Sequence, residues 1–237
     1  VLAPQSPGDC FYMAFEACRI ALEYMIPVML LSDGYLANGS EPWEIPNLKD
    51  LPEIKLKTIK SSDNFEPYKH DKESMARPWA IPGTPGLEHR IGGIEKKNNS
   101  GDISYDPENH EQMTRLRNEK VNVIAKSIPD LVPFGDESGE ILVVGWGSTY
   151  GAIKTAVENA REEGLSVSHI QLKYLNPLPK NLGDVLFKFN KIIVPELNMG
   201  QLNSILRSKF LVDSIGVNKI KGKPFTVDEI YSEIIKK

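Results

Sequence analysis

Apolar and polar residues follow a strand–helix–strand pattern over the last hundred residues. The apolar run Glu140–Trp146 has the length of a strand and leads into the glycine turn Gly145–Gly151. The helix expected next carries apolar residues at steps of three and four, namely Ile153, Ala156, Val157 and Ala160. Two further apolar runs, 167–172 and 191–194, flank a short predicted helix over 182–189. Lys219–Phe225 can add an edge strand, and Thr226 and Glu229 form a capping box for a final helix. This alternation predicts an α/β fold, with a parallel sheet covered by helices on both faces.

The first 33 residues predict a loop, a helix and a strand. The helix carries an apolar stripe opposite a polar ladder; the stripe is Phe11, Ala14, Phe15, Cys18 and Leu22, and the ladder is Glu16, Arg19 and Glu23. Pro27 ends the helix, and Val28–Leu31 is typical of a buried strand. Two strands do not form a stable sheet alone. We therefore expect this segment, which opens at Val1, to be completed by upstream sequence or by a neighbouring chain.

Polar residues follow two of the predicted strands. Asp33 and Tyr35 come after Val28–Leu31, and Glu196 and Asn198 come after the strand 191–194. Ligands of open parallel sheets bind at the carboxyl ends of strands, so these four residues form a possible strand-end site. Asp33 has an alternative role, which is to cap a turn before Gly34.

The segment between these two regions is irregular. Prolines and glycines recur throughout 34–137 and interrupt both helices and strands. Arg77, His89 and Arg90 are suited to bind a phosphate or carboxylate, although a surface turn with a solvated arginine is the alternative. A helix near 107–126 begins with an Asp cap followed by proline.

These patterns divide the chain into three parts: residues 1–41, an extended connection over 42–137 with one helix, and a sheet domain over 138–237. The net charge of −4 creates no field that would attract nucleic acid or an anionic membrane. No apolar run reaches the roughly 18 residues of a membrane span. We therefore expect a protein that binds neither nucleic acid nor membrane. Cys10 and Cys18 lie two turns apart on one predicted helix and are poorly placed to bridge, so we expect reduced thiols and a cytoplasmic protein.

Motifs that would identify a reaction are missing from the sequence. Cys10 and Cys18 are the two cysteines, and without a CxxC pair or clustered histidines we assign no metal ligand. The turn Gly145–Gly151 has the spacing GxGxxxG, and the acid that would hold a ribose is absent, so close packing of helix on strand explains its glycines better than a dinucleotide. With no P-loop, GxSxG or HExxH, we assign no catalytic residue.

Several stretches resemble thiamine-diphosphate enzymes. Ala3–Pro7 and Pro27–Asp33 resemble the end of their pyrimidine-binding domain. Residues 139–237 resemble the transketolase C-terminal domain, through Gly145–Gly151, Lys173–Leu178 and Pro195–Leu202. Within that superfamily, the chain resembles the alpha subunit of 2-oxoacid:ferredoxin oxidoreductases, most closely those acting on 2-oxoglutarate. The stretches that carry this narrower likeness are Val1–Asp9, Gly86–Glu95, Asp106–His110 and Pro195–Leu202.

The resemblance implies oxidative decarboxylation of a 2-oxoacid with coenzyme A, giving an acyl-CoA, CO2 and reduced ferredoxin. It implies thiamine diphosphate with Mg²⁺ and an iron–sulfur cluster in the full complex, and a beta subunit and ferredoxin as partners. We expect this chain to be a C-terminal fragment that binds none of these cofactors alone and is inactive alone. Arg77, His89 and Arg90 become possible contacts for coenzyme A or the 2-oxoacid.

Two other interpretations remain open. The chain could belong to a transketolase or E1-beta type of thiamine-diphosphate enzyme, although the long connection over 42–137 argues against that type. It could also be a non-enzymatic α/β interaction module. Recovery of a thiamine-diphosphate-binding partner chain would separate the enzymatic interpretations from the module.

Overall fold

A computed structural model describes residues 1–236, which form two compact units. The sheet unit contains Val1–Ala14, Met29–Glu44 and the chain from Ile128 onward. The loop unit contains Phe15–Val28 and Ile45–Ser127.

The sheet unit is built on four parallel strands. They are β3 (Gly139–Trp146), β4 (Val167–Leu172), β5 (Phe189–Glu196) and β6 (Ser214–Asn218), in the spatial order β4-β3-β5-β6. The central strand residues Leu142, Val143 and Val144 are fully buried. A strand that is apolar on consecutive residues, as β3 is, must be covered on both faces.

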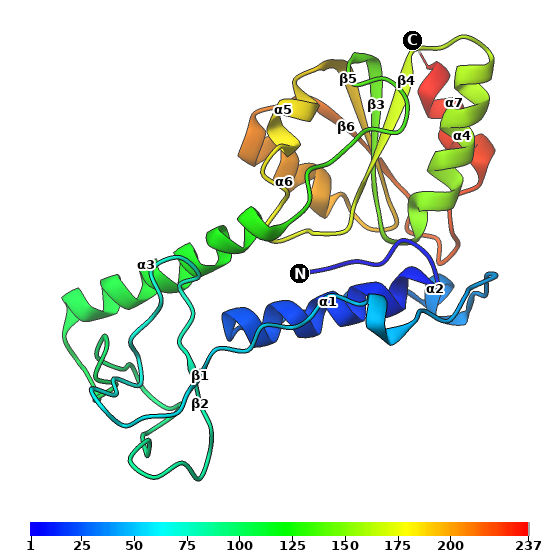
Figure 1. The fold of residues 1–237 in the computed structure, drawn as a ribbon. Coiled ribbons are helices and arrows are strands. Elements are labelled where there is room, and N and C mark those ends of the chain that lie inside the picture. The colour runs from blue at the N-terminus through cyan, green and yellow to red at the C-terminus, as the bar shows by residue number, and fades with distance from the viewer. Residues whose placement is uncertain (237) are drawn as a thin grey trace. The chain divides into compact units, whose positions relative to one another are not determined.

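Helices cover both faces of this sheet, as Figure 1 shows. Helices α4 (Tyr150–Glu162) and α7 (Val227–Ile235) pack on one face, where Ile153, Val157 and Ile230 join the core. Helices α5 (Leu182–Leu186) and α6 (Gln201–Phe210) pack on the other face. The short 3-10 helix η3 (Gly147–Thr149) joins β3 to α4. The predicted α/β class with a parallel sheet is confirmed.

The sequence suggests a strand over 219–225, and this prediction is wrong. The edge strand is β6, Ser214–Asn218, which pairs with β5 from Ile192 to Glu196. Residues 219–225 instead form a loop that is held to the start of α7, because the Lys219 ammonium donates to the Pro224 carbonyl and to Glu229. Thr226 and Glu229 form the predicted capping box.

Helix α1 (Asp9–Tyr24) does not bury the stripe expected of it. Phe11 and Leu22 expose 37% and 38% of their surface, and the side chains of Arg19 and Glu16 expose only 14% and 17%. The expected buried strand over 28–31 is also wrong, because Met29 is 63% exposed and only Leu30 bridges to Leu2 within residues 1–236. The apolar side chains are present, but the described residues do not cover them. Helix α2 (Gly34–Asn38) follows this segment.

The loop unit has little regular structure. Its longest helix is α3 (Pro107–Ile124). The Asp106 carboxylate caps this helix by accepting from the Glu108 amide, as the sequence predicts. The 3-10 helix η2 (Ala125–Ser127) extends it, and another, η1 (Leu48–Asp50), lies near the start of the unit. Strands β1 (Thr58–Ile59) and β2 (Trp79–Ala80) form a two-residue parallel pair.

Candidate functional site

The carboxyl end of the sheet, where ligands of such folds usually bind, is covered by the chain's own first residues. The Ala3 amide donates to the Lys173 carbonyl over 2.9 Å, and the Leu175 amide donates to the Val1 carbonyl over 2.9 Å. The Lys173 ammonium also pairs with Asp9 over 2.7 Å. Residues directly after β4 are therefore engaged by the N-terminal segment, which leaves less room for a ligand at this strand end.

Asp33 caps a helix and braces the glycine turn. One carboxylate oxygen accepts from the Tyr35 and Leu36 amides, each over 3.0 Å, which begins α2. The other accepts from the Ser148 hydroxyl on η3. The capping role that the sequence offers for Asp33 is confirmed. The Tyr35 side chain is 60% exposed.

Glu196 is a fully buried carboxylate at the end of β5. One oxygen accepts from the Trp146 indole over 3.2 Å and the Leu202 amide over 3.0 Å, and the other from the Asn203 amide over 2.9 Å. Asn198 donates its amide to Glu196 and accepts from the Gly200 amide over 2.7 Å. The strand-end pair Glu196 and Asn198 therefore fixes the start of α6, where the helix dipole favours a negative charge.

The glycine turn packs tightly, as predicted. A side chain at Gly145 would place its Cβ 2.5 Å from the Gln171 oxygen and 2.6 Å from the Ile153 side chain. Gly147 has a φ of 60°, which favours glycine. Ser148 and Thr149 are buried. Close contact between helix and strand therefore explains the motif.

A buried histidine that the sequence did not single out lies beside this turn. His169 on β4 is 2% exposed, and its Nε2 lies 3.2 Å from the Gln171 side-chain oxygen. The Gln171 amide in turn donates to the Gly147 carbonyl over 3.0 Å. Burial, with a smaller effect from the Lys154 charge, lowers the pKa of His169 to about 4, although the hydrogen bond to Gln171 acts in the opposite direction. His169 is therefore a neutral, structural side chain.

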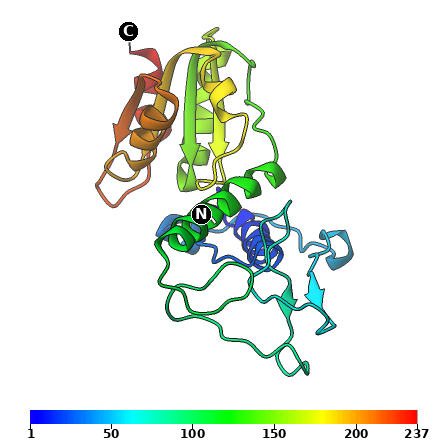
Figure 2. The ribbon, with the colours of Figure 1, turned by 90° about the vertical axis from the view of Figure 1, so that its left-hand side faces the viewer.

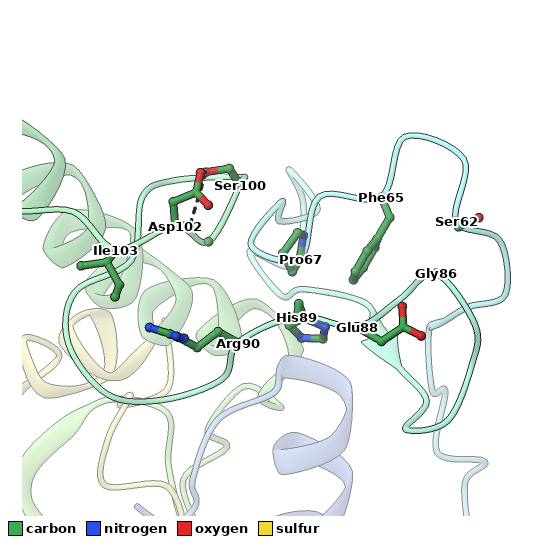
Figure 3. A pocket seen from close by; sticks show the side chains of 11 residues that line it. Ser62, Phe65, Pro67, Gly86, Glu88, His89, Arg90, Ser100, Asp102 and Ile103 are labelled. Carbon is green, nitrogen blue, oxygen red and sulfur yellow. Dashed lines mark hydrogen bonds between the residues drawn. The ribbon is translucent and has the colours of Figure 1, made fainter.

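The loop unit contains the cavity that brings together two of the predicted anion contacts. It has a volume of about 560 Å³, and Figure 3 shows His89 and Arg90 among the side chains that line it. Its other lining residues include Ser62, Phe65 and Asp102. Sequence reasoning missed these three, because they are far from 89–90 along the chain and carry no motif of their own.

His89 and Arg90 differ in how they are held. His89 Nδ1 lies 2.8 Å from the Leu87 carbonyl, and the ring packs edge-on against Phe65 with 5.4 Å between centroids. Such a bond requires a proton on Nδ1, which leaves Nε2 as the acceptor in the neutral ring. Arg90 is exposed and makes no hydrogen bond or ion pair to any residue from 1 to 236. Its guanidinium is free to bind an anion.

Two glycines with positive φ shape the walls of this cavity. A Cβ at Gly86 would lie 2.7 Å from that of Ser62, and one at Gly101 would lie 2.5 Å from the Tyr68 ring. Both positions therefore need glycine for conformation and for space. The lining also holds acids, Glu88 and Asp102, so an anion would have to bind locally at Arg90 rather than be drawn by a uniformly positive surface.

Arg77 lies outside the lining of the cavity but supports it. Its guanidinium stacks over the Tyr68 ring at 4.2 Å and donates to the Pro67 carbonyl over 3.1 Å. Pro67 lines the cavity and Tyr68 touches Gly101. Burial and the Arg77 charge together lower the pKa of Lys120. The structure therefore brings His89 and Arg90 together in the lining of the cavity. Arg77 lies behind that lining and supports it through Pro67 and Tyr68.

The described residues hold no cluster of three or more His, Cys, Asp or Glu side chains that could bind a metal ion. Within residues 1–236, no helix is both long enough and apolar enough to cross a bilayer.

Two family models match the chain. The model described as "Pyruvate flavodoxin/ferredoxin oxidoreductase, thiamine diP-bdg" matches residues 1–106. The model described as "Pyruvate:ferredoxin oxidoreductase core domain II" matches residues 139–230. The first therefore covers the N-terminal segment and the cavity, and the second covers the sheet.

Relatives of known name align with almost the whole chain. The chain is 55% identical over 233 residues to the 2-oxoglutarate oxidoreductase subunit KorA of Mycobacterium tuberculosis, covering 97% of this chain and 35% of that protein. It is 29% identical over 244 residues to the alpha subunit of 2-oxoacid:ferredoxin oxidoreductase 1 of Aeropyrum pernix, covering 97% of this chain and 37% of that protein. The chain thus spans little more than a third of the length of either relative.

A solved structure has the same fold. It is the 2-oxoglutarate:ferredoxin oxidoreductase from Magnetococcus marinus with 2-oxoglutarate, coenzyme A and succinyl-CoA bound, which is 30% identical in sequence. The match has a TM-score of 0.92 and covers 98% of this chain and 41% of that one. The chain belongs to the 2-oxoacid:ferredoxin oxidoreductase family, where it is similar to part of the alpha subunit.

Proposed function

We propose that this chain works as part of the alpha subunit of a 2-oxoglutarate:ferredoxin oxidoreductase. The reaction is the oxidative decarboxylation of the 2-oxoacid with coenzyme A, which gives an acyl-CoA, CO2 and reduced ferredoxin. The observation that carries the proposal is the 55% identity to the M. tuberculosis 2-oxoglutarate oxidoreductase subunit over nearly the whole chain. A beta subunit of the same enzyme and ferredoxin are the partners.

The described residues do not fit the metal-binding part of a thiamine diphosphate site. A diphosphate cofactor needs a divalent cation held by oxygen ligands, and residues 1–236 offer no cluster of acids for one. The proposal places the diphosphate, its Mg²⁺ and the iron–sulfur cluster on other parts of the complex.

The cavity of the loop unit is the place where we propose that this chain contributes to substrate binding. Coenzyme A carries phosphates and 2-oxoacids carry carboxylates, and both are anions that a planar guanidinium binds through two parallel hydrogen bonds. Arg90 is unpaired within the described chain, and the neighbouring His89 lines the same cavity. Arg77 holds the wall behind them. Asp33, Glu196 and Asn198 use their polar atoms within the chain, which favours a structural role for them.

The activity is tested on the complete enzyme that contains this chain. We expect reduction of ferredoxin or a viologen dye that requires both 2-oxoglutarate and coenzyme A, and no turnover by the 237-residue chain alone. Faster turnover of pyruvate than of 2-oxoglutarate would contradict the assignment of 2-oxoglutarate as the substrate. Turnover by the isolated chain, or no reaction of the complex with any 2-oxoacid, would contradict the proposal as a whole.

Replacing Arg90 tests the anion contact. In the complete enzyme, Arg90→Ala should raise the KM for coenzyme A or the 2-oxoacid by about tenfold to a hundredfold, because a hydrogen bond to a charged group is worth about 1.5–3 kcal/mol. Arg115→Ala is the matched control, since Arg115 is 78% exposed and pairs with Glu111 on the surface of α3. Equal KM values in the wild type and Arg90→Ala would show that Arg90 does not contact the anion.

Arg77 variants separate support from contact. Lysine keeps the charge but loses the flat stack on Tyr68 and the fixed geometry toward the Pro67 carbonyl. If Arg77 supports the wall, Arg77→Lys should resemble Arg77→Ala in both KM and melting temperature. If Arg77→Lys keeps the wild-type KM while alanine does not, Arg77 contacts the anion directly.

A further inference from the structure

Lys96 is a buried lysine that follows the cavity-lining residues of the loop unit. Only 4% of its surface is exposed, although a lysine is almost never fully buried unless it is paired. No acid pairs with Lys96 within residues 1–236. Its ammonium instead donates to the Gly92 carbonyl over 2.5 Å and to the Ile94 carbonyl over 2.7 Å. The buried charge is therefore satisfied by the backbone just before it in the chain.

These two bonds hold residues 90–94, which we call the Arg90 segment. Gly92 and Gly93 adopt φ values of 71° and 78°, and two consecutive glycines lose much conformational freedom when they are fixed. Packing does not fix them, because a Cβ at Gly92 would meet nothing within 4 Å and one at Gly93 would meet only the Lys96 nitrogen, at 3.8 Å. In the described chain, the hydrogen bonds to the Arg90 segment come from Lys96 alone.

Lys96 is itself anchored on helix α3, which Figure 2 draws in green. The Asn109 side chain, in the second turn of this helix, donates to the Lys96 carbonyl over 3.0 Å. The preceding residue, Glu95, pairs with His110 over 2.7 Å and with Arg117 over 3.2 Å. The ammonium therefore extends from a backbone that the longest helix of the loop unit holds in place.

The Arg90 segment connects this anchor to the cavity. Ile103 forms a bridge with Lys96 and lines the cavity together with Arg90, as Figure 3 shows. Only Ile91 lies between Arg90 and the tethered Gly92. Because the Arg90 side chain makes no hydrogen bond or ion pair in the described chain, its place depends on its backbone. A group that is fixed before its ligand arrives loses less freedom on binding.

We propose that Lys96 is a positioning residue for the anion site, whose ammonium holds the Arg90 segment so that the Arg90 guanidinium stays at the cavity. This inference rests on the proposed role of Arg90 in binding coenzyme A or the 2-oxoacid. A lysine suits the task, because an ammonium carries three donors and can bind more than one carbonyl at once.

A double-mutant cycle in the complete enzyme tests this role. Lys96→Met removes the ammonium but keeps an unbranched apolar side chain, and water can reach the carbonyls of the exposed Gly92 and Ile94. We expect it to raise the KM of the ligand that Arg90→Ala affects by about tenfold, with kcat within about twofold of the wild type. In the Arg90→Ala background it should change KM by less than about twofold, because the residue that it positions is gone.

Lys97→Met is the matched control, because Lys97 is an exposed lysine at the next position and should leave KM unchanged. A wild-type KM in Lys96→Met, or an equal rise with and without Arg90, would overturn the positioning role. If the wild-type complex lacks the proposed activity, or Arg90→Ala leaves KM unchanged, the proposed function of the site fails instead. The structure of the variant then decides whether Lys96 holds the segment.

Electron cryo-microscopy of the complete enzyme provides that structure and does not depend on activity. In Lys96→Met, density for the Arg90 segment should weaken relative to the wild type, while density for residues 97–104 should stay the same. An Arg90 segment that keeps its wild-type position and density would overturn the proposal. Equal weakening of both stretches would also overturn it, because Lys96 would then support the whole loop instead of Arg90.

Discussion

Glu196→Ala is expected to destabilise the sheet unit by about 4 kcal/mol or more, measured as the free energy of unfolding in urea. The variant would leave buried donors of Trp146, Asn198, Leu202 and Asn203 without their acceptor, and it would open a cavity where the carboxylate was. Total stabilities of domains are about 5–15 kcal/mol, so this loss would leave little folded protein at elevated temperature.

Two further variants distinguish this structural role from a ligand-binding one. Glu196→Gln keeps the shape but turns a donor toward the Asn203 amide, so it should still lose about 2 kcal/mol. Glu158→Gln is the control, because that half-exposed carboxylate makes only a 3.8 Å pair with Lys154 on α4 and should change stability little. Wild-type stability of Glu196→Gln would contradict the capping role.

Acid is expected to weaken the fold through His169. The pKa of this buried ring is lowered to about 4 in the folded chain, whereas an unperturbed histidine has a value of 6.5. Below 6.5 the unfolded chain therefore binds a proton that the folded chain does not, so the stabilising effect is full at neutral pH and is lost as the pH falls toward 4. Between pH 7 and pH 5 the free energy of unfolding should drop by about 2 kcal/mol from this group.

The contribution of His169 is isolated by comparison with His169→Gln, because carboxylates elsewhere also titrate in acid. The glutamine variant can still donate to Gln171 but does not bind a proton in this range. Urea unfolding at pH 7 and pH 5 should therefore show a smaller loss in the variant than in the wild type. Parallel losses in the two proteins would mean that His169 is not neutral when buried.

The sheet unit from 139 onward was largely predictable because its apolar periodicity is satisfied by local neighbours. The stripe Ile153, Ala156, Val157 and Ala160 packs on the adjacent strands, and the capping box at Thr226 uses residues three apart. The edge strand was misplaced because Gly216 interrupts the apolar run of β6, whereas Gly222 and Pro224 disfavour a strand over the predicted stretch Lys219–Phe225. Pairing with β5, which is not a local property, decides that position.

Helix α1 shows where periodicity is insufficient. The spacing of Phe11, Ala14, Phe15, Cys18 and Leu22 identifies an apolar face correctly, but it carries no information on which residues cover that face. In the described chain this face is mostly exposed, whereas Arg19 is held between Glu16 and Glu23 with little exposure. Burial depends on partners distant in sequence or on other chains, which a pattern of residues within one helix does not specify.

The candidate cavity was predictable only in part for the same reason. Residue chemistry identified His89 and Arg90, and the structure places both on one lining. Arg77 has the same chemistry, yet its neighbours Tyr68 and Pro67 engage it. The signal that could have located the walls is the pair of glycines with positive φ, Gly86 and Gly101, but their contacts require knowledge of the fold.

The two units are built from alternating segments of the chain, which limits how either unit can be expressed without the other. The backbone passes between them four times, at 14–15, 28–29, 44–45 and 127–128, and the first passage falls inside helix α1. A truncation after Ser127 keeps the whole loop unit but leaves it joined to Val1–Ala14 and Met29–Glu44 of the sheet unit, whereas no single truncation keeps the sheet unit without the loop unit. Only a rearranged gene, in which the separated segments are rejoined by new linkers, would express one unit as an independent piece.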